Sequence, residues 1–485
     1  MGCYDLLPGD YGDFFLIANI ASDECYGGGG YTDAYGNQVW DEFKDYNDLE
    51  INRYTWSGRY YKAIRRCTVL TEVLDQIDWG DQPDLRNRYE AEARFLRAHF
   101  YFEMQRNFGH IPLVKTSEAE NIPQTDPDEV YAYMIDDLKF AIDNLPETRF
   151  EAIASDEVGR ATKWAAEGYL ARVFLFYTGY YEKTEAPGLT KQETIDYLED
   201  CISNSGHSLV KRYGSLWPWS KREDYHHDVT LQYAGEYNPE IVFAIKNSVQ
   251  RANGYPKYIG MRGIPYSGAY APFYPGWGMA TITPKCFNSF EVGDTRRYAS
   301  IIDLETEEIP NVGDDQREFT GYVQKKYMTL TSEADPTVSD PEANGASSWM
   351  YGYQDQIIMR YADVLLMAAE LELNSHAEKS QAYFDLVRDR AFGDEDHRIA
   401  VTQDAIFNER GFEFVFEGIR YYDVLRQGLQ QAKEILDVRN AVVWNGRHEV
   451  TKNIDFPLEK QGLLRIPQSE IELSEGLLIQ NPGWN

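Results

Sequence analysis

Apolar residues recur at helical spacing through much of the first 205 positions. The clearest stretch is 84–108, where an apolar side chain returns every three or four residues before Gly109 and Pro112 stop the pattern. The members of this stripe are Leu85, Tyr89, Ala93, Leu96, Phe100 and Met104. The same spacing predicts four more helices, over 52–77, 126–145, 162–181 and 191–204. The first half of the chain is therefore expected to be helical.

A second helical stretch runs from 356 to 428. The spacing of Ile358, Tyr361, Leu365 and Ala368 predicts a first helix, and a second is expected to end at Gly393. The third is expected to begin at Thr402. It carries a charged stripe at steps of four, four and three, formed by Glu409, Glu413, Glu417 and Arg420, beside an aromatic face of Phe412, Phe416 and Tyr422. Taken alone, the charges indicate a solvated helix face.

Two of the helical segments resemble each other. EARFLRAHFYFEM and AEGYLARVFLFYT align with Leu96 opposite Leu170 and Phe100 opposite Phe174, an offset of 74 residues. This offset is about twice the period of tetratricopeptide repeats when linkers vary. One helical hairpin cannot bury its apolar face alone, so such repeats stack on their neighbours. The similarity predicts a scaffold of stacked helical hairpins.

The pattern changes between 206 and 350, where no long amphipathic helix is evident. Glu240 to Lys246 reads EIVFAIK, a strand pattern. Gly254 to Gly278 holds 6 Gly, 4 Pro and 7 aromatic residues in 25 positions, which predicts turns that display side chains. We expect 303–341 to form an exposed loop and 440–485 to be irregular, with Pro467 and Pro482 fixing the last segment.

Composition narrows the possible partners. The net charge of -32 and the lack of a long basic run argue against nucleic acid and against charge-driven binding to anionic lipid. Aromatic residues reach 14%, with 36 Tyr and 10 Trp, which suits binding surfaces as well as cores. No apolar run reaches the roughly 18 residues that a membrane span needs. The five cysteines have neither CxxC nor metal-ligand spacing.

Cofactor motifs are weak throughout. Gly27–Gly30 is followed by Tyr31 and Thr32 instead of the lysine of a phosphate loop, so it predicts a surface turn. Nearby carboxylates could hold calcium, namely Asp23, Glu24 and Asp33, but no EF-hand spacing supports this. His226-His227-Asp228 is the one histidine cluster, and adjacent residues rarely share a metal. We therefore predict no metal or other cofactor, with calcium as the remaining option.

Several motifs near the C-terminus, in order, resemble one family. They are RYADVLLMAAE, VRDRA, NERGFEFVFEGIRYYDVLRQG, LLRIPQSEI and LIQNPGWN. Together they are similar to the SusD/RagB family of nutrient-binding, starch-binding-like lipoproteins at the cell surface. Members often carry two arginines after the glutamate, and here Arg410 is followed by Gly411. The resemblance implies that the charged stripe is scaffold, with Glu413, Glu417, Arg420 and Asp423 as structural ion-pair partners.

The resemblance also implies an architecture. The expected fold is mainly α: a tetratricopeptide-repeat-like helical scaffold with a large irregular loop-rich insertion containing short strands. Residues 1–485 would form a single SusD-like domain, with its scaffold over 52–205 and 356–435. The insertion would cover 206–350 and would bind ligand, and 436–485 would be an irregular C-terminal segment.

Candidate binding residues follow from the chemistry of sugars. Sugar rings have apolar faces, which stack on flat aromatic side chains, and polar rims, which bind amides and charged groups. We predict stacking residues at Trp40, Trp217, Trp219, Tyr270, Tyr274, Trp277 and Trp349. Asn253 and Arg262 are predicted polar contacts. Neighbouring prolines are expected to limit how far four of the rings can turn inward, those of Trp217, Trp219, Tyr274 and Trp277. No catalytic motif such as G-x-S-x-G or HExxH is present.

The predicted function is non-catalytic capture of an oligosaccharide or polysaccharide at the cell surface, for nutrient uptake. The resemblance implies an outer-membrane lipoprotein that delivers glycan to a SusC-like TonB-dependent transporter. Its lipid anchor would lie outside this sequence, because Cys3 lacks a preceding apolar lipobox. Three alternatives stay open: a peptide-binding member of the family, a repeat adaptor for a protein partner, and a polysaccharide-cleaving enzyme.

Overall fold

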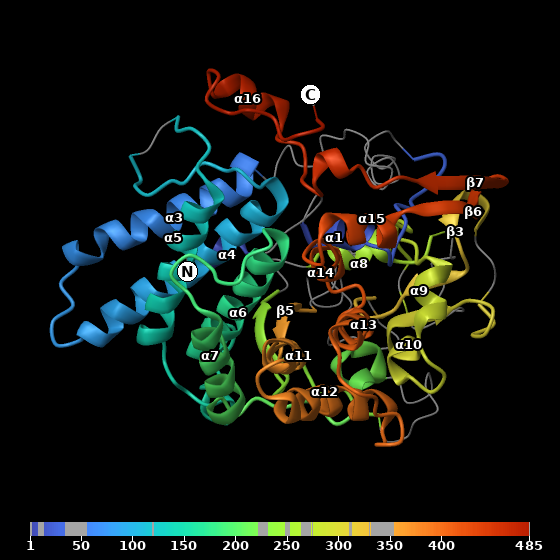
Figure 1. Ribbon diagram of the computed structural model, residues 1–485, viewed down its shortest axis with the longest axis horizontal. Helices are drawn as coiled ribbons and strands as arrows, with labels where there is room; N and C mark the ends of the chain where they lie inside the picture. The colour runs from blue at the N-terminus through green and yellow to red at the C-terminus, as the bar shows by residue number, and fades with distance from the viewer. Residues whose placement is uncertain are drawn as a thin grey trace.

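Stacked antiparallel helices form one half of the molecule (Figure 1). The computed structural model describes residues 2–7, 14–33, 56–118, 121–221, 231–247, 253–262, 273, 275–309, 313–328, 330 and 354–484. Within these, each of five consecutive helices packs on the next one in the chain. They are α3 (Lys62–Val73), α4 (Pro83–Phe108), α5 (Pro127–Asn144), α6 (Lys163–Tyr180) and α7 (Lys191–Asn204). The sequence predicted all five, although a π-helical turn at Trp56–Tyr61 precedes α3.

A second set of helices continues the stack. Helix α7 packs on α11 (Tyr361–Glu372), which packs on α12 (Ala377–Phe392) and on α13 (Gln403–Glu413). Helix α14 (Arg420–Leu425) packs on the early helix α1 (Phe14–Ala21) and on α15 (Leu429–Leu436). This arrangement confirms a mainly helical, tetratricopeptide-like scaffold assembled from distant parts of the chain.

Local capping explains where several of these helices begin and end. Thr162, Thr190 and Thr402 each accept a hydrogen bond from the third helical residue, satisfying an otherwise unpaired backbone N–H. At the end of α12, Gly393 adopts a left-handed φ of 81°, which a residue without Cβ reaches at little cost. The predicted boundary at Gly393 is confirmed, as is the start at Thr402.

Two predictions in this stretch are wrong. The first predicted helix begins only at Tyr361, because Gln356–Arg360 is a strand, β5. The third ends at Glu413, and Phe416 and Gly418 then adopt positive φ values of 61° and 70°. The chain therefore turns sharply between α13 and α14, and the charged stripe is split between a helix, a turn and a second helix.

The charged stripe is also buried, where its charges alone indicated a solvated face. Arg360 uses all five of its N–H donors: two to Glu413 (2.7 Å and 2.9 Å), two to Glu417 (2.8 Å and 3.0 Å) and one to Glu240 (2.6 Å). Four more buried cations form ion pairs with these glutamates or with Asp294 and Glu409, which completes a buried charge cluster. The cations are Arg296, Arg388, Arg390 and Lys326. The ion-pair role that the resemblance implied for Glu413 and Glu417 agrees with these contacts.

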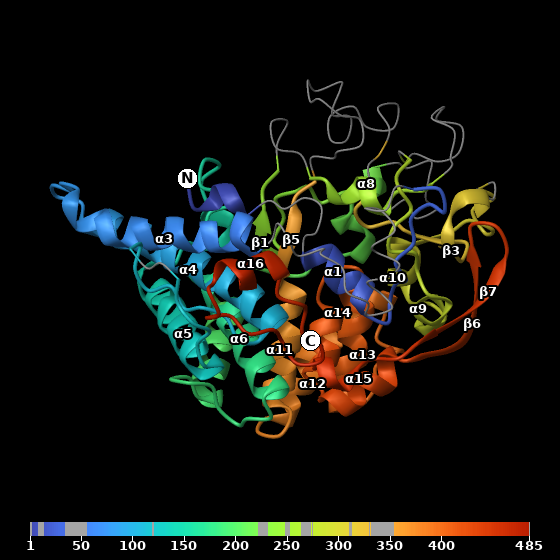
Figure 2. The ribbon, with the colours of Figure 1, turned by 90° about the horizontal axis from the view of Figure 1, so that it is seen from above.

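Short strands form three small sheets. The predicted strand at 240–246 is present as β1 (Ile241–Ile245), and it pairs antiparallel with β5. In the second sheet, β2 (Ile301–Asp303) pairs with β4 (Tyr322–Gln324). The third sheet has the order β3 (Arg317–Phe319), β6 (Val438–Asn445), β7 (Glu449–Ile454) and is antiparallel throughout. The third sheet joins the insertion (β3) to the C-terminal segment (β6 and β7) at one end of the molecule (Figure 2).

The α-helices in the described part of the insertion are all short. They are α8 (Tyr255–Ile259), α9 (Pro284–Ser289) and α10 (Thr295–Ser300). Two expectations need correction. The segment 303–341 is not simply an exposed loop, because β3 and β4 lie in it and residues 324–328 are buried. The segment 440–485 is not irregular throughout, because β6, β7 and α16 (Gln468–Leu473) occupy much of it.

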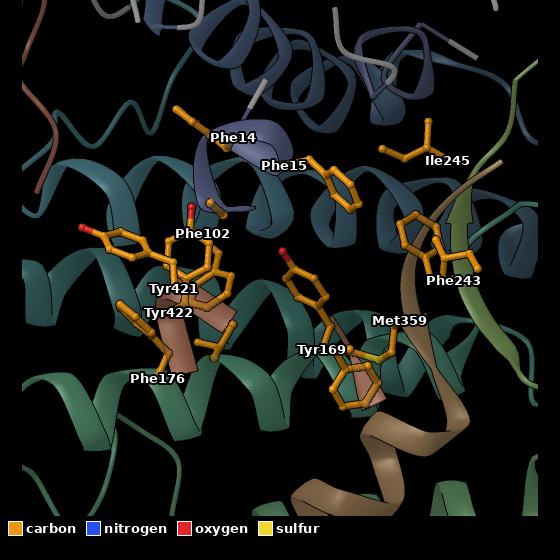
Figure 3. Close-up of a cluster of buried hydrophobic side chains, with 14 of the residues drawn as sticks. Phe14, Phe15, Phe102, Tyr169, Phe176, Phe243, Ile245, Met359, Tyr421 and Tyr422 are labelled. Atoms are coloured by element: carbon orange, nitrogen blue, oxygen red, sulfur yellow. The ribbon is translucent and has the colours of Figure 1, made fainter. Parts of the chain in front are cut away.

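The main core lies between α4, α6 and the elements that cover them. Phe102 from α4 contacts Tyr169 and Phe176 from α6. Figure 3 shows these residues in one buried cluster with Phe14 and Phe15 from α1 and with Phe243, Met359, Tyr421 and Tyr422. Rings meet mostly edge to face, as Phe102 and Phe176 do at 5.8 Å, the arrangement that aromatic quadrupoles favour. Helices α4 and α6 are buried on nearly every side, which fits their central position.

Candidate functional site

Of the three predicted stacking residues that the structure describes, Trp277 is partly exposed, and it lies on a segment hydrogen-bonded to α8. Its backbone N–H donates to the carbonyl of Lys257 (2.8 Å), and the N–H of Met279 donates to the carbonyl of Tyr258 (2.8 Å). Gly278 bonds to Gly260 in the same way (2.9 Å). These bonds fix the segment along a helix of five residues, so the position of Trp277 is set by backbone contacts.

Two glycines make this close approach possible. A Cβ on Gly260 would lie 2.8 Å from the Cα of Gly276, closer than real side chains come. The residues therefore touch backbone to backbone, which only glycine permits at both positions. The glycine- and proline-rich composition predicted turns, and its physical role here is to let two chain segments meet beneath Trp277.

The ring of Trp277 is half-buried and supported from one side. It meets Tyr258 edge to face at 5.4 Å, and the ammonium of Lys257 lies 5.1 Å from its centre. An indole held this way has restricted rotation and keeps part of its surface accessible. A flat apolar face beside a cation is suited to a ligand with an apolar face and hydroxyl groups at its rim.

Arg262 holds the glycine-rich turn in place. Its guanidinium donates to Asp33 (2.7 Å) and to Asp315 (2.6 Å), and it lies so close to Gly30 that a Cβ there would overlap it. Burial would raise the pKa of Asp315, but hydrogen bonds from Arg262 and Thr32 outweigh it and lower that pKa below its usual value. Because two carboxylates already engage its donors, Arg262 acts here as a clamp between the turn and the insertion.

Asn253 is buried, and its amide is used within the protein. The side chain donates to the carbonyl of Gln354 (3.1 Å) and accepts from the backbone N–H of Tyr255 (3.0 Å). It therefore binds the backbone at the first residue of α8 and is not placed to meet a ligand. In this way Asn253 supports α8, to which the segment of Trp277 is bound.

Trp217 and Trp219 are buried, each 1% exposed, so neither offers a face to a ligand. Trp217 packs edge to face with Tyr327 at 5.2 Å, and the ammonium of Lys325 lies 4.3 Å from the ring of Trp219. Pro218 does not hold the rings outward, because it begins a buried 3₁₀ turn. The physical reason is that the buried lysines 325 and 326 need electron-rich partners, which the two indoles supply.

Four further predicted stacking residues lie outside the described residues: Trp40, Tyr270, Tyr274 and Trp349. The cluster His226-His227-Asp228 also lies outside them. The predictions for these positions therefore stay predictions.

Each of the three carboxylates considered for calcium binds a different group of the protein. Asp23 pairs with Arg420 (2.9 Å), Glu24 accepts from the backbone N–H of Phe416 (3.0 Å), and Asp33 pairs with Arg262. Across the residues that the structure describes, no three His, Cys, Asp or Glu side chains gather as a metal site. In the same residues, no helix is both long and apolar enough to span a bilayer.

The sequence prediction missed a cleft next to the third sheet. It has a volume of about 690 Å³, and Phe319 and Trp444 line it. Trp444 lies on β6, one residue before its last residue Asn445, and residues 446–448 lead to β7. An Asn-Gly pair between alternating residues is a strong hairpin signal, and Gly446 has the positive φ (95°) that such turns need. That signal could have revealed the hairpin, though not the cleft.

Comparisons with known proteins agree with the fold. The SusD family matches residues 310–484, and a family described as starch-binding, associating with the outer membrane, matches residues 28–175. A SusD-like protein of Bacteroides ovatus is 25% identical over 388 residues, covering 76% of this chain and 64% of that relative's length. SusD-like protein P2 of Formosa agariphila is 24% identical over 429 residues, covering 84% of this chain and 76% of the relative.

Solved structures match over almost the full length. A laminarin-binding SusD-like protein has a TM-score of 0.77 and 25% identity, covering 99% of this chain and 97% of its own. Surface glycan-binding protein A from Bacteroides thetaiotaomicron, in complex with laminarihexaose, has a TM-score of 0.79 and 23% identity with the same coverage. Both family matches, the curated relatives and the shared helical fold agree with the C-terminal motifs, and the chain belongs to the SusD/RagB family.

Proposed function

We propose that this protein is a non-catalytic glycan-binding protein of the cell surface, associated with the outer membrane. The observation that carries the proposal is its match, over 99% of its length, to a laminarin-binding SusD-like protein of the same fold. The half-buried indole of Trp277, held over Tyr258, gives the chain a stacking residue of the kind that sugar binding needs. The bound glycan would then pass to a SusC-like TonB-dependent transporter.

The site that we assign to this function is the surface around Trp277, on the segment bound to α8. The aromatic contact would come from Trp277, whose ring is half-buried. Asn253, Arg262 and the paired glycines hold the segment in position from beneath. Asn253 and Arg262 therefore bind other groups of the protein and are not assigned a contact with the ligand.

Affinity electrophoresis against a panel of neutral and acidic polysaccharides, starting with laminarin, tests the proposal. We expect retardation by at least one polysaccharide without release of new reducing ends. New reducing ends would indicate an enzyme and contradict the proposal. Binding of oligopeptides in a calorimeter, with no retardation by any polysaccharide, would instead favour the peptide-binding alternative.

The assigned site makes a sharper prediction. Trp277→Ala should weaken binding to the retarding polysaccharide by roughly 1–3 kcal/mol, because the stacked aromatic face is lost. The unfolding midpoint should change little, since the ring is only half-buried. Calorimetric titration measures the first effect and thermal denaturation the second.

Trp79→Ala is the matched control for this variant. Trp79 is also a partly exposed indole, but it lies near the start of α4, in the helical half of the molecule away from α8 (Figure 2). It should leave binding unchanged. Wild-type affinity in the Trp277→Ala variant would show that the sugar binds elsewhere.

A further inference from the structure

We propose that the cleft between the third sheet and the segment after β2 is a second binding site, for a neutral oligosaccharide. The inference rests on the proposed function and adds a place and a ligand class to it. The cleft volume of about 690 Å³ lies inside the range of roughly 300–1,000 Å³ for small-ligand sites. Trp277 is not among the described residues that line it.

The floor of the cleft is one face of the sheet. Phe319 on β3 pairs with Trp444 on β6, and Trp444 pairs with Glu449 on β7. Paired residues of neighbouring strands point to the same face, so these three side chains form one row across the sheet. Val442, two residues before Trp444, shares that face and is 64% exposed. The result is an apolar, aromatic floor that ends in a carboxylate.

The opposite face of the hairpin is the buried one. Val443 and Ile454 pack with Tyr26 in a small separate core. This core fixes the alternation of β6, because a slip by one residue would expose Val443 and bury Trp444. The outward position of Trp444 is therefore set by packing on the other side of the sheet.

The wall facing the floor adds polar groups. Glu305 follows β2, and Asp314 precedes β3, and both are exposed at the cleft. Glu449, at the end of the floor, is exposed as well, and a carboxylate oxygen at an exposed position can accept hydrogen bonds from a ligand. Leu304 and Ile309 complete the wall as apolar residues.

The negative charge of the residues that line the cleft favours a neutral ligand over an anionic one. Among the described residues that line the cleft, three are acidic and none is basic. An anionic sugar would be repelled by these carboxylates, in a protein whose net charge is already -32. A neutral oligosaccharide offers hydroxyl donors to the carboxylates and an apolar ring face to Trp444. A neutral oligosaccharide therefore complements both the carboxylates and the aromatic floor of the cleft.

Helix α8, to which the segment of Trp277 is bound, and strands β3, β6 and β7 lie away from α3 and α5 (Figures 1 and 2). The cleft and the segment of Trp277 are connected, because Gln316, one residue before β3, donates a hydrogen bond to the carbonyl of Gly278, next to Trp277. A polysaccharide that reached both sites would gain avidity over an oligosaccharide that reaches one.

The test compares Trp444→Ala, Trp277→Ala and Trp79→Ala with the wild type, using laminarin and then whichever neutral polysaccharide of the panel retards the wild type. We expect Trp444→Ala to weaken binding of the polysaccharide about 10-fold, through loss of one of two linked sites. Val442→Arg is a second variant, at an exposed position, that should block the cleft without disturbing the core and weaken binding to a similar extent. Trp79→Ala should bind like the wild type.

The outcomes separate the two proposals. If the wild type binds and both cleft variants bind equally well, the second site is wrong, while the proposed function stands. If the wild type binds no polysaccharide, the proposed function fails and the cleft proposal fails with it. Binding of a lysine-rich peptide that Val442→Arg abolishes, with sugar binding unaffected, would assign the cleft to a basic peptide and overturn the inference.

Discussion

Arg360→Met is expected to lower the free energy of unfolding by about 3–5 kcal/mol, the usual cost of removing one partner from a buried ion pair. Arg360 is 1% exposed and donates five hydrogen bonds to Glu240, Glu413 and Glu417. Methionine keeps an unbranched chain of similar length, so the loss is mainly one of charge and hydrogen bonds.

The balance of the cluster explains the size of the effect. Its buried cations are Arg296, Arg360, Arg388, Arg390 and Lys326, and its buried carboxylates are Asp294, Glu240, Glu409, Glu413 and Glu417. Five charges of each sign cancel, and removal of one cation leaves a buried negative charge. Burial alone would raise the pKa of Glu413, but the charges of Arg390, Arg360 and Arg296 lower it to about 2. Loss of Arg360 removes part of that stabilisation.

Urea denaturation at pH 7 measures the change, from the midpoint and its slope. Arg398→Met is the control, because Arg398 pairs with Asp389 at the surface and exposed pairs contribute about 0–1 kcal/mol. The double variant Arg360→Met/Glu417→Gln restores neutrality and should recover part of the stability. If Arg360→Met lowers the free energy of unfolding by less than about 1 kcal/mol, the prediction is wrong. Water or relaxation of the structure would then stabilise the negative charge that the substitution leaves buried.

The helical scaffold could be predicted from the sequence because its signals are local. The apolar stripe of 84–108, the cap at Thr402 and the stop at Gly393 each act within a few residues. The break after Glu413 could not be predicted this way, because the charged spacing continues through Phe416 and Gly418 at helical steps. Its cause is tertiary: Arg296 and Arg390 contact Glu413 from other parts of the chain.

The candidate site was less predictable than the fold. Trp217, Trp219 and Trp277 all carry a neighbouring proline or glycine, yet two are buried and one is half-buried. The difference in burial depends on what packs on each ring. Lys325 packs on Trp219 and Lys326 packs on Trp217, although both lysines are about 100 residues away in sequence. Residue type indicated the chemistry, and only the three-dimensional arrangement separates core from surface.

Glu24→Gln is expected to stabilise the protein increasingly as pH rises from about 4.5 to about 8. Glu24 is buried between the glycine-rich turn and the turn after α13, where one carboxyl oxygen accepts from the N–H of Phe416 and the other is buried without a hydrogen-bond partner among the described residues. Burial is the largest cause that raises the pKa of Glu24, and Asp23 adds to it, while the Phe416 hydrogen bond, Arg420 and Lys326 lower it. The net result is a pKa of about 8.

The sign of the effect follows from proton binding. Between pH 4.5 and 8 the folded protein holds a proton on Glu24 that the unfolded chain releases, so stability falls as pH rises. Glutamine cannot titrate and keeps the acceptor for Phe416. The difference between variant and wild type should therefore grow by about 1.4 kcal/mol per pH unit, to about 3–5 kcal/mol near pH 8, and then level off. Other titrating groups are common to both proteins and cancel in the difference.

Urea denaturation of both proteins at pH 5, 6, 7, 8 and 9 measures this slope. Glu193→Gln is the control: hydrogen bonds from the Thr190 backbone and from Lys139 lower the pKa of Glu193 to about 2, so it is ionised in both states above pH 5. Its difference from the wild type should stay constant over this range. A constant difference for Glu24→Gln as well would mean that Glu24 is ionised in the folded protein, with Arg420 or Lys326 balancing its charge.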